Sequence, residues 1–324
     1  MRICIYGAGA IGAWLGIELS RAGEDVTMIA RGPHLHAMQK NGATLLINGE
    51  ERVAHPRCIE DPGEAGIQDF VIITLKAHSF PPVVEKLRPL MNDATAVVTG
   101  VNGIPWWYFY KLEGPYENHT LESVDPGACI WTAIGPERAI GCVVYPAAEI
   151  AEPGVIRHIE GDRFVLGEPD GLPSARSESL CNALQNAGFT SRVRNNIRDD
   201  IWIKLWGNLC FNPISALTNA TLDLVAGEPG TAAVCRLMML EAQAIGEKLG
   251  AKFRVSVDRR LAGGAAVGPH KTSMLQDLEL GRPMEIDALV TVVQELGRLV
   301  DVPTPTIDVV LPLIQQRARV AGTY

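Results

Sequence analysis

The sequence predicts an α/β fold in two domains, with alternating strands and helices over residues 1–194 and an all-helical C-terminal domain over residues 195–324. Three observations lead to this prediction. A chain of 324 residues exceeds the usual span of one hydrophobic core. Short strand-like runs alternate with helical patterns in the first half. Near residues 194–197 the strand signals mostly end, and helical periodicity continues to the C-terminus.

The first predicted elements are a strand, a glycine-rich turn and a helix. Residues 2–12 read RICIYGAGAIG, a helical pattern follows over 13–23, and a second strand is predicted at 25–30. In a GxGxxG turn one glycine permits the tight bend, the next lets the backbone approach a pyrophosphate, and the third lets the helix pack on the strand. We therefore expect a Rossmann-type dinucleotide-binding domain, and the alternative is a glycine-rich turn without a ligand. The expected cofactor-binding residues are Gly7, Ala8, Gly9, Ala10, Ile11 and Gly12.

The end of the second strand indicates which dinucleotide is bound. NAD-preferring folds place Asp or Glu there to bind the ribose 2′-hydroxyl group. This chain has Ala30 and Arg31 instead. A guanidinium suits a 2′-phosphate, so NADP(H) is the predicted cofactor. A surface arginine without a role is the alternative.

Two further buried strands are expected to end at functional positions. A hairpin around Asn48-Gly49 is predicted over 42–59. Segment 69–78 then contains a strand that ends at Lys76, and segment 94–104 contains a strand that ends near Asn102. The carboxyl ends of parallel strands carry ligand-binding residues, which places Lys76 and Asn102 beside the cofactor. Each of them could instead be an ordinary loop residue.

The rest of the first domain is predicted as strands over 139–150, 154–160 and 163–169, a helix over 174–188 and a strand over 190–194. Residues 105–127 are aromatic and loop-like. They could border a ligand site or pack on a partner subunit, and the sequence leaves both open.

The second half is predicted to contain helices over 197–219, 231–250, 270–281, 284–300 and 304–320. In the first of these, Lys204, Asn208 and Asn212 share one face of a helix that is otherwise almost entirely apolar. A polar row on a buried helix needs partners. A lysine that snorkels to water and a structural network between helices are alternatives. We favour a row that offers an ammonium and two amides to a polar ligand in a cleft beside the nucleotide-binding sheet.

Composition excludes several classes of partner. A net charge of -8 argues against nucleic acids and anionic membranes as partners. Outside the glycine-rich N-terminal segment, no stretch reaches the 18 apolar residues of a membrane span. The 7 cysteines are odd in number and scattered, which is typical of reduced thiols in a cytoplasmic protein. We expect no metal site, and we interpret His34 and His36 as surface-loop residues.

Five sequence blocks carry a resemblance to the ketopantoate reductase (2-dehydropantoate 2-reductase) family. They are GAGAIG at 7–12, TLKA at 74–77, NGI at 102–104, KLWGNLCFNP at 204–213 and SMLQDLELGRPMEID at 273–287. The glycine motif occurs in many dehydrogenases, whereas the later blocks in this order are more specific. The resemblance implies NADPH-dependent hydride transfer that reduces 2-dehydropantoate to (R)-pantoate in pantothenate biosynthesis.

The resemblance also implies residue roles. Lys204 would be the general acid, and Glu285 would be the carboxylate that partners the lysine, the substrate and the cofactor. Arg31, Lys76 and Asn102 would face the cofactor. The residues expected to bind substrate are Asn102, Asn208, Asn212 and Ser273. This agrees with the chemistry, because hydride transfer builds an alkoxide that an ammonium can stabilise and protonate.

Other interpretations stay open at this point. The substrate could be a different 2-oxo acid or related carbonyl compound, or the chain could be a non-catalytic NADP(H)-binding sensor. Asp277, one helical turn after Ser273, is either a second acidic candidate or a solvated carboxylate. The apolar stripes of the C-terminal helices fit a homodimer interface and intramolecular packing equally well.

Overall fold

The computed structural model describes all residues 1–324 and divides the chain into two compact units. The first unit contains Met1–Val101, Pro105–Thr120 and Gly127–Ile197. The second contains Asn102–Ile104, Leu121–Pro126 and Arg198–Tyr324. The main division therefore falls between Ile197 and Arg198, three residues after the predicted boundary, and two short segments of the first half belong to the second unit.

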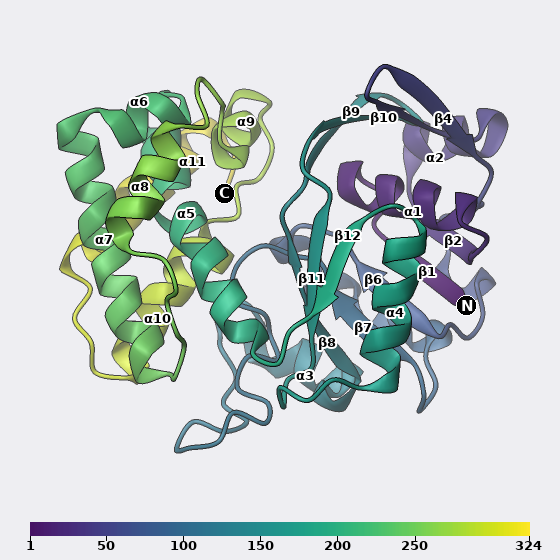
Figure 1. Cartoon of the computed structure of the whole chain (residues 1–324), viewed down its shortest axis with the longest axis horizontal. Helices are drawn as coiled ribbons and strands as arrows, with labels where there is room; N and C mark the ends of the chain where they lie inside the picture. Colours follow the sequence, from purple (N-terminus) through teal and green to yellow (C-terminus); the bar gives the residue numbers. More distant parts are fainter. The chain divides into compact units, whose positions relative to one another are not determined.

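An eight-stranded sheet forms the centre of the first unit (Figure 1). Its order is β12-β11-β8-β7-β6-β1-β2-β5, and every neighbouring pair is parallel except β8 and β11. The strands are β1 (Arg2–Tyr6), β2 (Asp25–Ile29), β5 (Arg57–Ile59), β6 (Phe70–Ile73), β7 (Ala96–Thr99), β8 (Ala139–Val144), β11 (Arg163–Gly167) and β12 (Thr190–Val193). Strands buried on both faces read as continuous apolar runs, which is why β6 and β7 were recognisable in the sequence.

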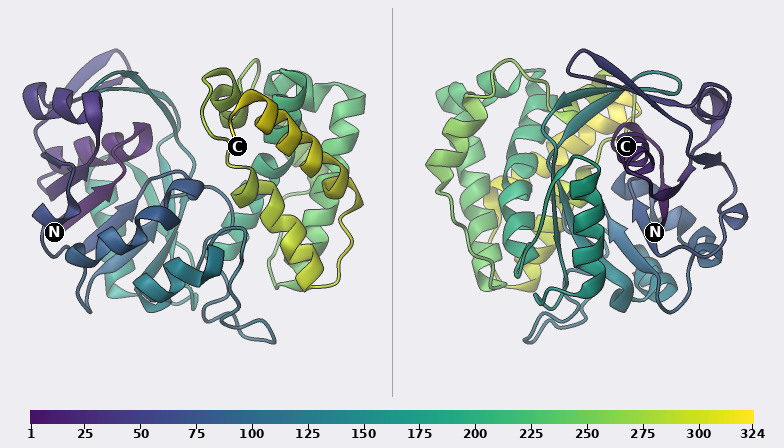
Figure 2. Two further views of the ribbon diagram at one scale, coloured as in Figure 1. Left: turned by 180° about the vertical axis from the view of Figure 1, so that it is seen from behind. Right: turned by 45° about the vertical axis from the view of Figure 1, so that its right-hand side comes forward.

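A smaller sheet of order β4-β3-β10-β9 completes the β structure (Figure 2). It consists of β3 (Ala43–Ile47), β4 (Glu50–Ala54), β9 (Ala147–Glu152) and β10 (Val155–Glu160). The predicted hairpin is confirmed as β3 and β4, and Asn48 and Gly49 have φ values of 52° and 77°, as its tight turn requires. Its predicted range of 42–59 is too long, because residues 57–59 form β5 of the main sheet. The single strand predicted over 139–150 is wrong. It is two strands in different sheets, separated at Tyr145-Pro146, where proline cannot donate a ladder hydrogen bond.

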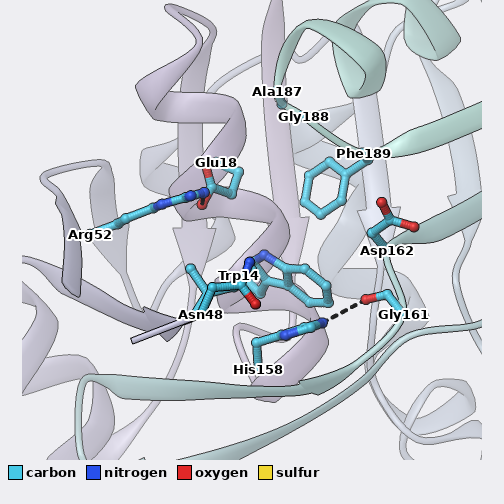
Figure 3. Close-up of a pocket in the computed structure, with 11 residues that line it drawn as sticks. Trp14, Glu18, Asn48, Arg52, His158, Gly161, Asp162, Ala187, Gly188 and Phe189 are labelled. Carbon is cyan, nitrogen blue, oxygen red and sulfur yellow. Dashed lines mark hydrogen bonds and ion pairs between the residues drawn. The ribbon is translucent and has the colours of Figure 1, made fainter. Parts of the chain in front are cut away.

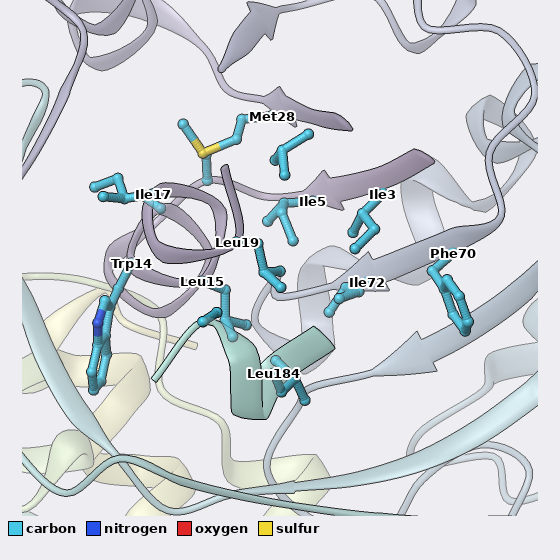
Figure 4. Close-up of a cluster of buried hydrophobic side chains, with 14 of the residues drawn as sticks. Ile3, Ile5, Trp14, Leu15, Ile17, Leu19, Met28, Phe70, Ile72 and Leu184 are labelled. Atoms are coloured by element: carbon cyan, nitrogen blue, oxygen red, sulfur yellow. The ribbon is translucent and has the colours of Figure 1, made fainter. Parts of the chain in front are cut away.

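The helices of the first unit are α1 (Ala10–Arg21), α2 (Gly32–Asn41), α3 (Cys129–Ile134) and α4 (Ala175–Asn186). Short 3-10 segments are η1 (Pro62–Glu64), η2 (Ala77–Ser79), η3 (Pro81–Leu90), η4 (Pro126–Ala128) and η5 (Pro136–Arg138). Helix α1 lies between the two sheets, so it is buried along most of its length (Figure 4). Its Leu15 and Ile17 belong to the same apolar cluster as Ile5 and Met28 of the main sheet. On the side of the smaller sheet, the Trp14 and His158 rings are in contact, with their centroids 4.7 Å apart.

The aromatic stretch after β7 packs on the main sheet of its own chain. Trp106, Trp107, Tyr108 and Phe109 are at most 3% exposed. The Trp106 indole nitrogen donates to Thr99 Oγ1 at 3.1 Å, and the Trp107 ring lies against the backbone of Gly141. Of the loop-like stretch 105–127, residues 105–125 contain no strand or helix, and its last two residues begin the 3-10 segment η4. These contacts account for the buried rings without a partner subunit.

The second unit is helical, as predicted. It comprises α5 (Ile197–Thr218), α6 (Leu222–Gly227), α7 (Pro229–Lys248), α8 (Val257–Ala265), α9 (Ser273–Glu279), the π turn η6 (Asp287–Thr291), α10 (Val292–Leu299) and α11 (Pro305–Ala321). The sequence did not reveal α6 or α8, because both are short and α8 contains Gly263 and Gly264, which are poor helix formers. None of the helices combines the length and hydropathy needed to cross a membrane.

Glu295 explains why residues 121–126 belong to the second unit. Its carboxylate accepts hydrogen bonds from the backbone N–H groups of Glu122 at 2.8 Å and Ser123 at 2.9 Å, and also from the Ser123 hydroxyl. A single carboxylate of α10 therefore fixes a segment that precedes it by more than 170 residues.

Candidate functional site

The turn between β1 and α1 has the geometry of a phosphate-binding loop. Gly7 has a φ of +103°, which L side chains rarely adopt. A Cβ atom on Gly12 would lie 2.3 Å from Thr74 Oγ1 and 2.4 Å from the Gly7 carbonyl oxygen, so only glycine lets α1 approach the sheet here. A Cβ atom on Gly9 would meet nothing within 4 Å. The space outside the Gly9 backbone is therefore open to a ligand.

The backbone amides of this loop divide into two groups. Those of Gly7 and Ala8 donate to the Ile29 carbonyl, and that of Gly9 donates to the Gly7 carbonyl, so these three are already used. The amides of Ala10, Ile11 and Gly12 begin α1 and have no intrahelical acceptor. No side chain caps the helix, and its first turn has no acidic residue. The open, positively polarised helix start fits the pyrophosphate of a dinucleotide.

Arg31 is the nearest sequence-predicted cation to this loop along the chain. It is exposed, occupies the N-cap position of α2 and directly follows β2 and Ala30, so no carboxylate stands at the end of that strand. Its charge also acts on Tyr6, the last residue of β1. Burial raises the pKa of Tyr6, and the positive charge of Arg31 lowers it. Strand β6 ends at Ile73 and not at Lys76 as predicted. Lys76 lies three residues further on, at the N-cap of η2.

The interpretation of His34 and His36 as loop residues is wrong, because both lie on α2. His34 Nδ1 accepts a hydrogen bond from the Gly154 N–H at 2.9 Å, which connects α2 to the turn between β9 and β10. Burial lowers the pKa of His34, so its neutral form is favoured. These contacts are structural, and no cluster of three metal-binding side chains occurs in the chain.

In the second unit, Lys204 forms the central contact of the predicted polar row. Its ammonium donates to Asn102 Oδ1 at 2.6 Å, so the lysine does not simply snorkel to water. Lys204 and Asn208 are half-buried on α5, and Asn212 is 5% exposed. The two residues of the short hydrogen bond are 102 positions apart, and no local pattern could have paired them.

Gly103 holds Asn102 close to the segment that carries Glu285. Its φ is +99°, and a Cβ atom would lie 2.1 Å from the Ala288 carbonyl oxygen. Glu285 is half-buried and precedes Ala288 by three residues, two residues before the π turn begins at Asp287. π turns are frequent at functional sites. Sequence reasoning missed Gly103, although its place in the NGI block was a usable signal.

The far end of the row contacts α9. Asn212 Nδ2 donates to Ser273 Oγ at 3.4 Å, and Ser273 begins α9 behind the N-cap Thr272, whose hydroxyl accepts from the Leu275 N–H. Asp277 is 8% exposed, so its interpretation as a solvated carboxylate is wrong. The second unit thus brings together Lys204 with Asn102 and Asn212 with Ser273. An ammonium held in this way can stabilise a developing alkoxide and transfer a proton to it.

A separate pocket in the first unit does not coincide with any predicted site residue (Figure 3). It has a volume of about 330 Å³, and Trp14, Phe189 and His158 form its aromatic wall. Glu18 and Arg52 form an ion pair at 3.0 Å on another side. The pocket adjoins the side chains of α1 rather than the glycine loop at its N-terminus, so we do not assign it to the cofactor.

Comparison with known proteins identifies the family that the chain matches. The family described as ketopantoate reductase PanE/ApbA matches residues 3–171, and its C-terminal domain family matches residues 196–318. A 2-dehydropantoate 2-reductase of Mesorhizobium japonicum is 56% identical over 325 residues, which cover 100% of both chains.

Solved structures show the same architecture. A ketopantoate reductase candidate from Ralstonia solanacearum MolK2 has a TM-score of 0.95 and 41% identity, covering 100% of this chain and 99% of the other. A D-mandelate dehydrogenase solved with NADH and anilino(oxo)acetate has a TM-score of 0.84 with 19% identity and covers 100% of both chains, which shows a shared fold.

Proposed function

Because the chain belongs to the ketopantoate reductase family, we propose that it reduces 2-dehydropantoate to (R)-pantoate with NADPH, in the cytoplasm and as a step of pantothenate biosynthesis. The observation that carries the proposal is the hydrogen bond from the Lys204 ammonium to Asn102, in a row of polar side chains on a largely buried helix. The relative from Mesorhizobium japonicum, which aligns end to end with this chain, supports the choice of substrate.

In the proposed mechanism, bound NADPH would supply the hydride for the 2-oxo carbon. Residues 7–12 and the free amides of α1 would hold its pyrophosphate, while Arg31 and Lys76 would hold its phosphate and ribose side. Asn102 orients the ammonium, and Lys204 donates a proton to the carbonyl oxygen as negative charge develops on it. Glu285 offsets the cost of holding this cation away from bulk water. Asn208, Asn212 and Ser273 hydrogen-bond the polar groups of the substrate.

Chain connectivity supports a role for Asn102 toward both ligands. It follows Thr99, the last residue of β7, by three positions. Covalent chain length alone keeps it within about 11 Å of that strand end. The carboxyl ends of the strands in such sheets are where dinucleotides and their substrates bind.

A panel of substrates tests the proposal. NADPH oxidation is measured with 2-dehydropantoate and with 2-oxo acids of different size and charge, such as pyruvate, 2-oxoisovalerate, 2-oxoglutarate and phenylglyoxylate. We expect the highest kcat/KM for 2-dehydropantoate. Equal or better turnover of another acid would instead support the second candidate, the same mechanism with a different 2-oxo acid. The fold shared with a D-mandelate dehydrogenase is the reason to include an aromatic acid. Tight NADPH binding without turnover of any carbonyl compound would indicate a sensor.

The cofactor preference gives a separate prediction. Arg31→Ala removes the only guanidinium at the end of β2, so NADPH affinity should fall by about tenfold or more while NADH affinity stays nearly constant. Fluorescence titrations with both nucleotides measure this. Lys40→Ala, at an exposed position of the same helix, is the control and should change neither affinity. An equal loss for NADPH and NADH would contradict the assignment of Arg31 to the 2′-phosphate.

We also propose a homodimer. Leu237 and Leu240 of α7 and Val309 and Leu313 of α11 are large apolar side chains that are between 45% and 61% exposed, on two helices that contact each other. Large apolar side chains exposed on two neighbouring helices favour a surface that another protein covers. Light scattering coupled to size-exclusion chromatography measures the mass, and a monomeric mass at micromolar concentration would refute the proposal.

A further inference from the structure

Arg260 of α8 has a guanidinium without a partner. The side chain is half-buried, and its Nε atom is buried without a hydrogen-bond acceptor. The backbone N–H of Arg260 donates to the Ser256 carbonyl, but its guanidinium forms no hydrogen bond and no ion pair with any residue of the chain. Burying part of a charged group without an acceptor is costly, and a bound anion would supply the missing acceptor.

The Arg260 guanidinium lies directly against α5, the helix that carries Lys204. A Cβ atom on Gly207 of α5 would be 2.3 Å from Arg260 Nη2. Any side chain at position 207 would therefore displace the guanidinium. Gly207 follows Lys204 by three residues, so the two lie on adjacent turns of the same side of the helix. Glycine thus gives a second cation access to the helix that carries the proposed acid.

Neighbouring contacts define where Arg260 lies relative to the polar row. Gly264 lies one turn after Arg260 on α8, and the Phe211 ring packs against it. Helix α8 therefore covers the side of α5 that carries Gly207 and Phe211. On the opposite side of the row, Asn212 contacts Ser273 of α9. Lys204 and Asn208 lie between these two contacts on the helical circumference. A ligand that binds the row is therefore flanked by α8 and by α9.

No acidic side chain of α5 forms an ion pair with Arg260. Cys210, on the same helix, is fully buried, and burial raises the pKa of its thiol well above the ordinary value, which keeps it neutral. The nearby guanidinium acts in the opposite direction. Gly207 and Phe211 carry no side-chain charge. An arginine in these surroundings presents its planar N–H groups in the geometry that matches a carboxylate.

We propose that Arg260 is a specificity-determining residue that binds a carboxylate of the 2-oxo acid substrate beside Lys204. The inference rests on the proposed function and names the group that recognises the anionic end of the substrate. Recognition by Arg260 sets KM more than kcat, because the carboxylate carries its charge in the ground state and in the transition state alike.

Kinetics of Arg260→Met and Arg260→Lys test this inference. Met keeps the apolar volume of the stem without the charge, and Lys keeps the charge without the planar pair of donors. We expect Arg260→Met to raise KM for 2-dehydropantoate by about 10- to 100-fold, with a smaller change in kcat, and Arg260→Lys to have an intermediate effect. Arg259→Met is the matched control, because Arg259 is an exposed neighbour on the same helix and should leave both constants unchanged.

A neutral substrate separates charge recognition from a structural role. The methyl ester of the same 2-oxo acid lacks the anion, so Arg260→Met should leave its kcat/KM unchanged while that of the acid falls. Equal losses for acid and ester, or an unchanged KM for the acid in a variant with wild-type thermal stability, would overturn the inference. If the wild-type protein prefers another 2-oxo acid, the same comparison is made with that acid and its ester, and only the choice of substrate fails. Absence of turnover with every acid would refute the proposed function and this inference with it.

Discussion

Replacing Lys204 with alanine should lower kcat for the 2-oxo acid by about 100-fold or more, while the affinity for NADPH stays within about twofold of the wild-type value. The substitution removes the ammonium that donates to Asn102 at 2.6 Å and, in the proposed mechanism, protonates the alkoxide. A general acid of this kind typically contributes about 10²- to 10⁴-fold to the rate. Steady-state kinetics measure the first quantity, and fluorescence titration measures the second.

Two further variants define what the lysine contributes. Lys204→Arg keeps the positive charge, but a guanidinium hardly ever releases its proton, so turnover should remain low even if the substrate binds. Lys252→Ala, at an exposed position of the same unit, should behave as the wild type. Wild-type turnover in Lys204→Ala would rule out the acid role, and recovery of full turnover in Lys204→Arg would show that charge alone is needed.

Alanine substitutions in the glycine loop should separate cofactor binding from folding. Gly9 has ordinary backbone angles, with φ of -75°, and its Cβ would meet no atom of the protein. Gly9→Ala should therefore fold normally but bind NADPH at least about tenfold more weakly, because the methyl group occupies the space expected for the pyrophosphate. Thermal unfolding and fluorescence titration are measured on the same preparation.

Gly12→Ala provides the contrast. Its Cβ would meet Thr74 Oγ1 and the Gly7 carbonyl, and a backbone carbonyl cannot move aside as a flexible side chain can. Overpacking of this kind typically costs about 1–3 kcal/mol, so the unfolding temperature of Gly12→Ala should decrease markedly. If Gly9→Ala binds NADPH as tightly as the wild type, residues 7–12 do not form the phosphate site. If Gly12→Ala is as stable as the wild type, the close approach of α1 to the sheet is not required.

Local signals were sufficient for much of the fold. The GxGxxG spacing predicted β1, the turn and α1, and the Asn48-Gly49 pair predicted the hairpin of β3 and β4. The five long helical patterns all correspond to helices of the second unit. The failures occurred where local preference was weak or ambiguous. Helix α8 is short and rich in glycine, and the residues of β8 and β9 form one apolar run that only a proline divides.

The candidate site was predictable as a set of residues but not as an arrangement. The spacing of Lys204, Asn208 and Asn212 placed them on one helical face, because helical periodicity acts between neighbours in the chain. That Lys204 meets Asn102, and that Asn212 meets Ser273, depends on contacts between segments 102 and 61 residues apart. No periodic pattern encodes such pairings.

The amino-acid sequence by itself determined the two kinds of domain, the glycine loop and the identity of the polar residues on α5. These features follow from backbone preferences and from the periodicity of apolar side chains, which act over a few residues. Only the tertiary structure decided which residues became partners. It joined Asn102 to Lys204 by a hydrogen bond and packed the aromatic segment after β7 on the main sheet. It also buried Asp277 and placed the Arg260 guanidinium against Gly207. The physical reason is that close packing couples residues through volume and hydrogen bonding, irrespective of their separation along the chain.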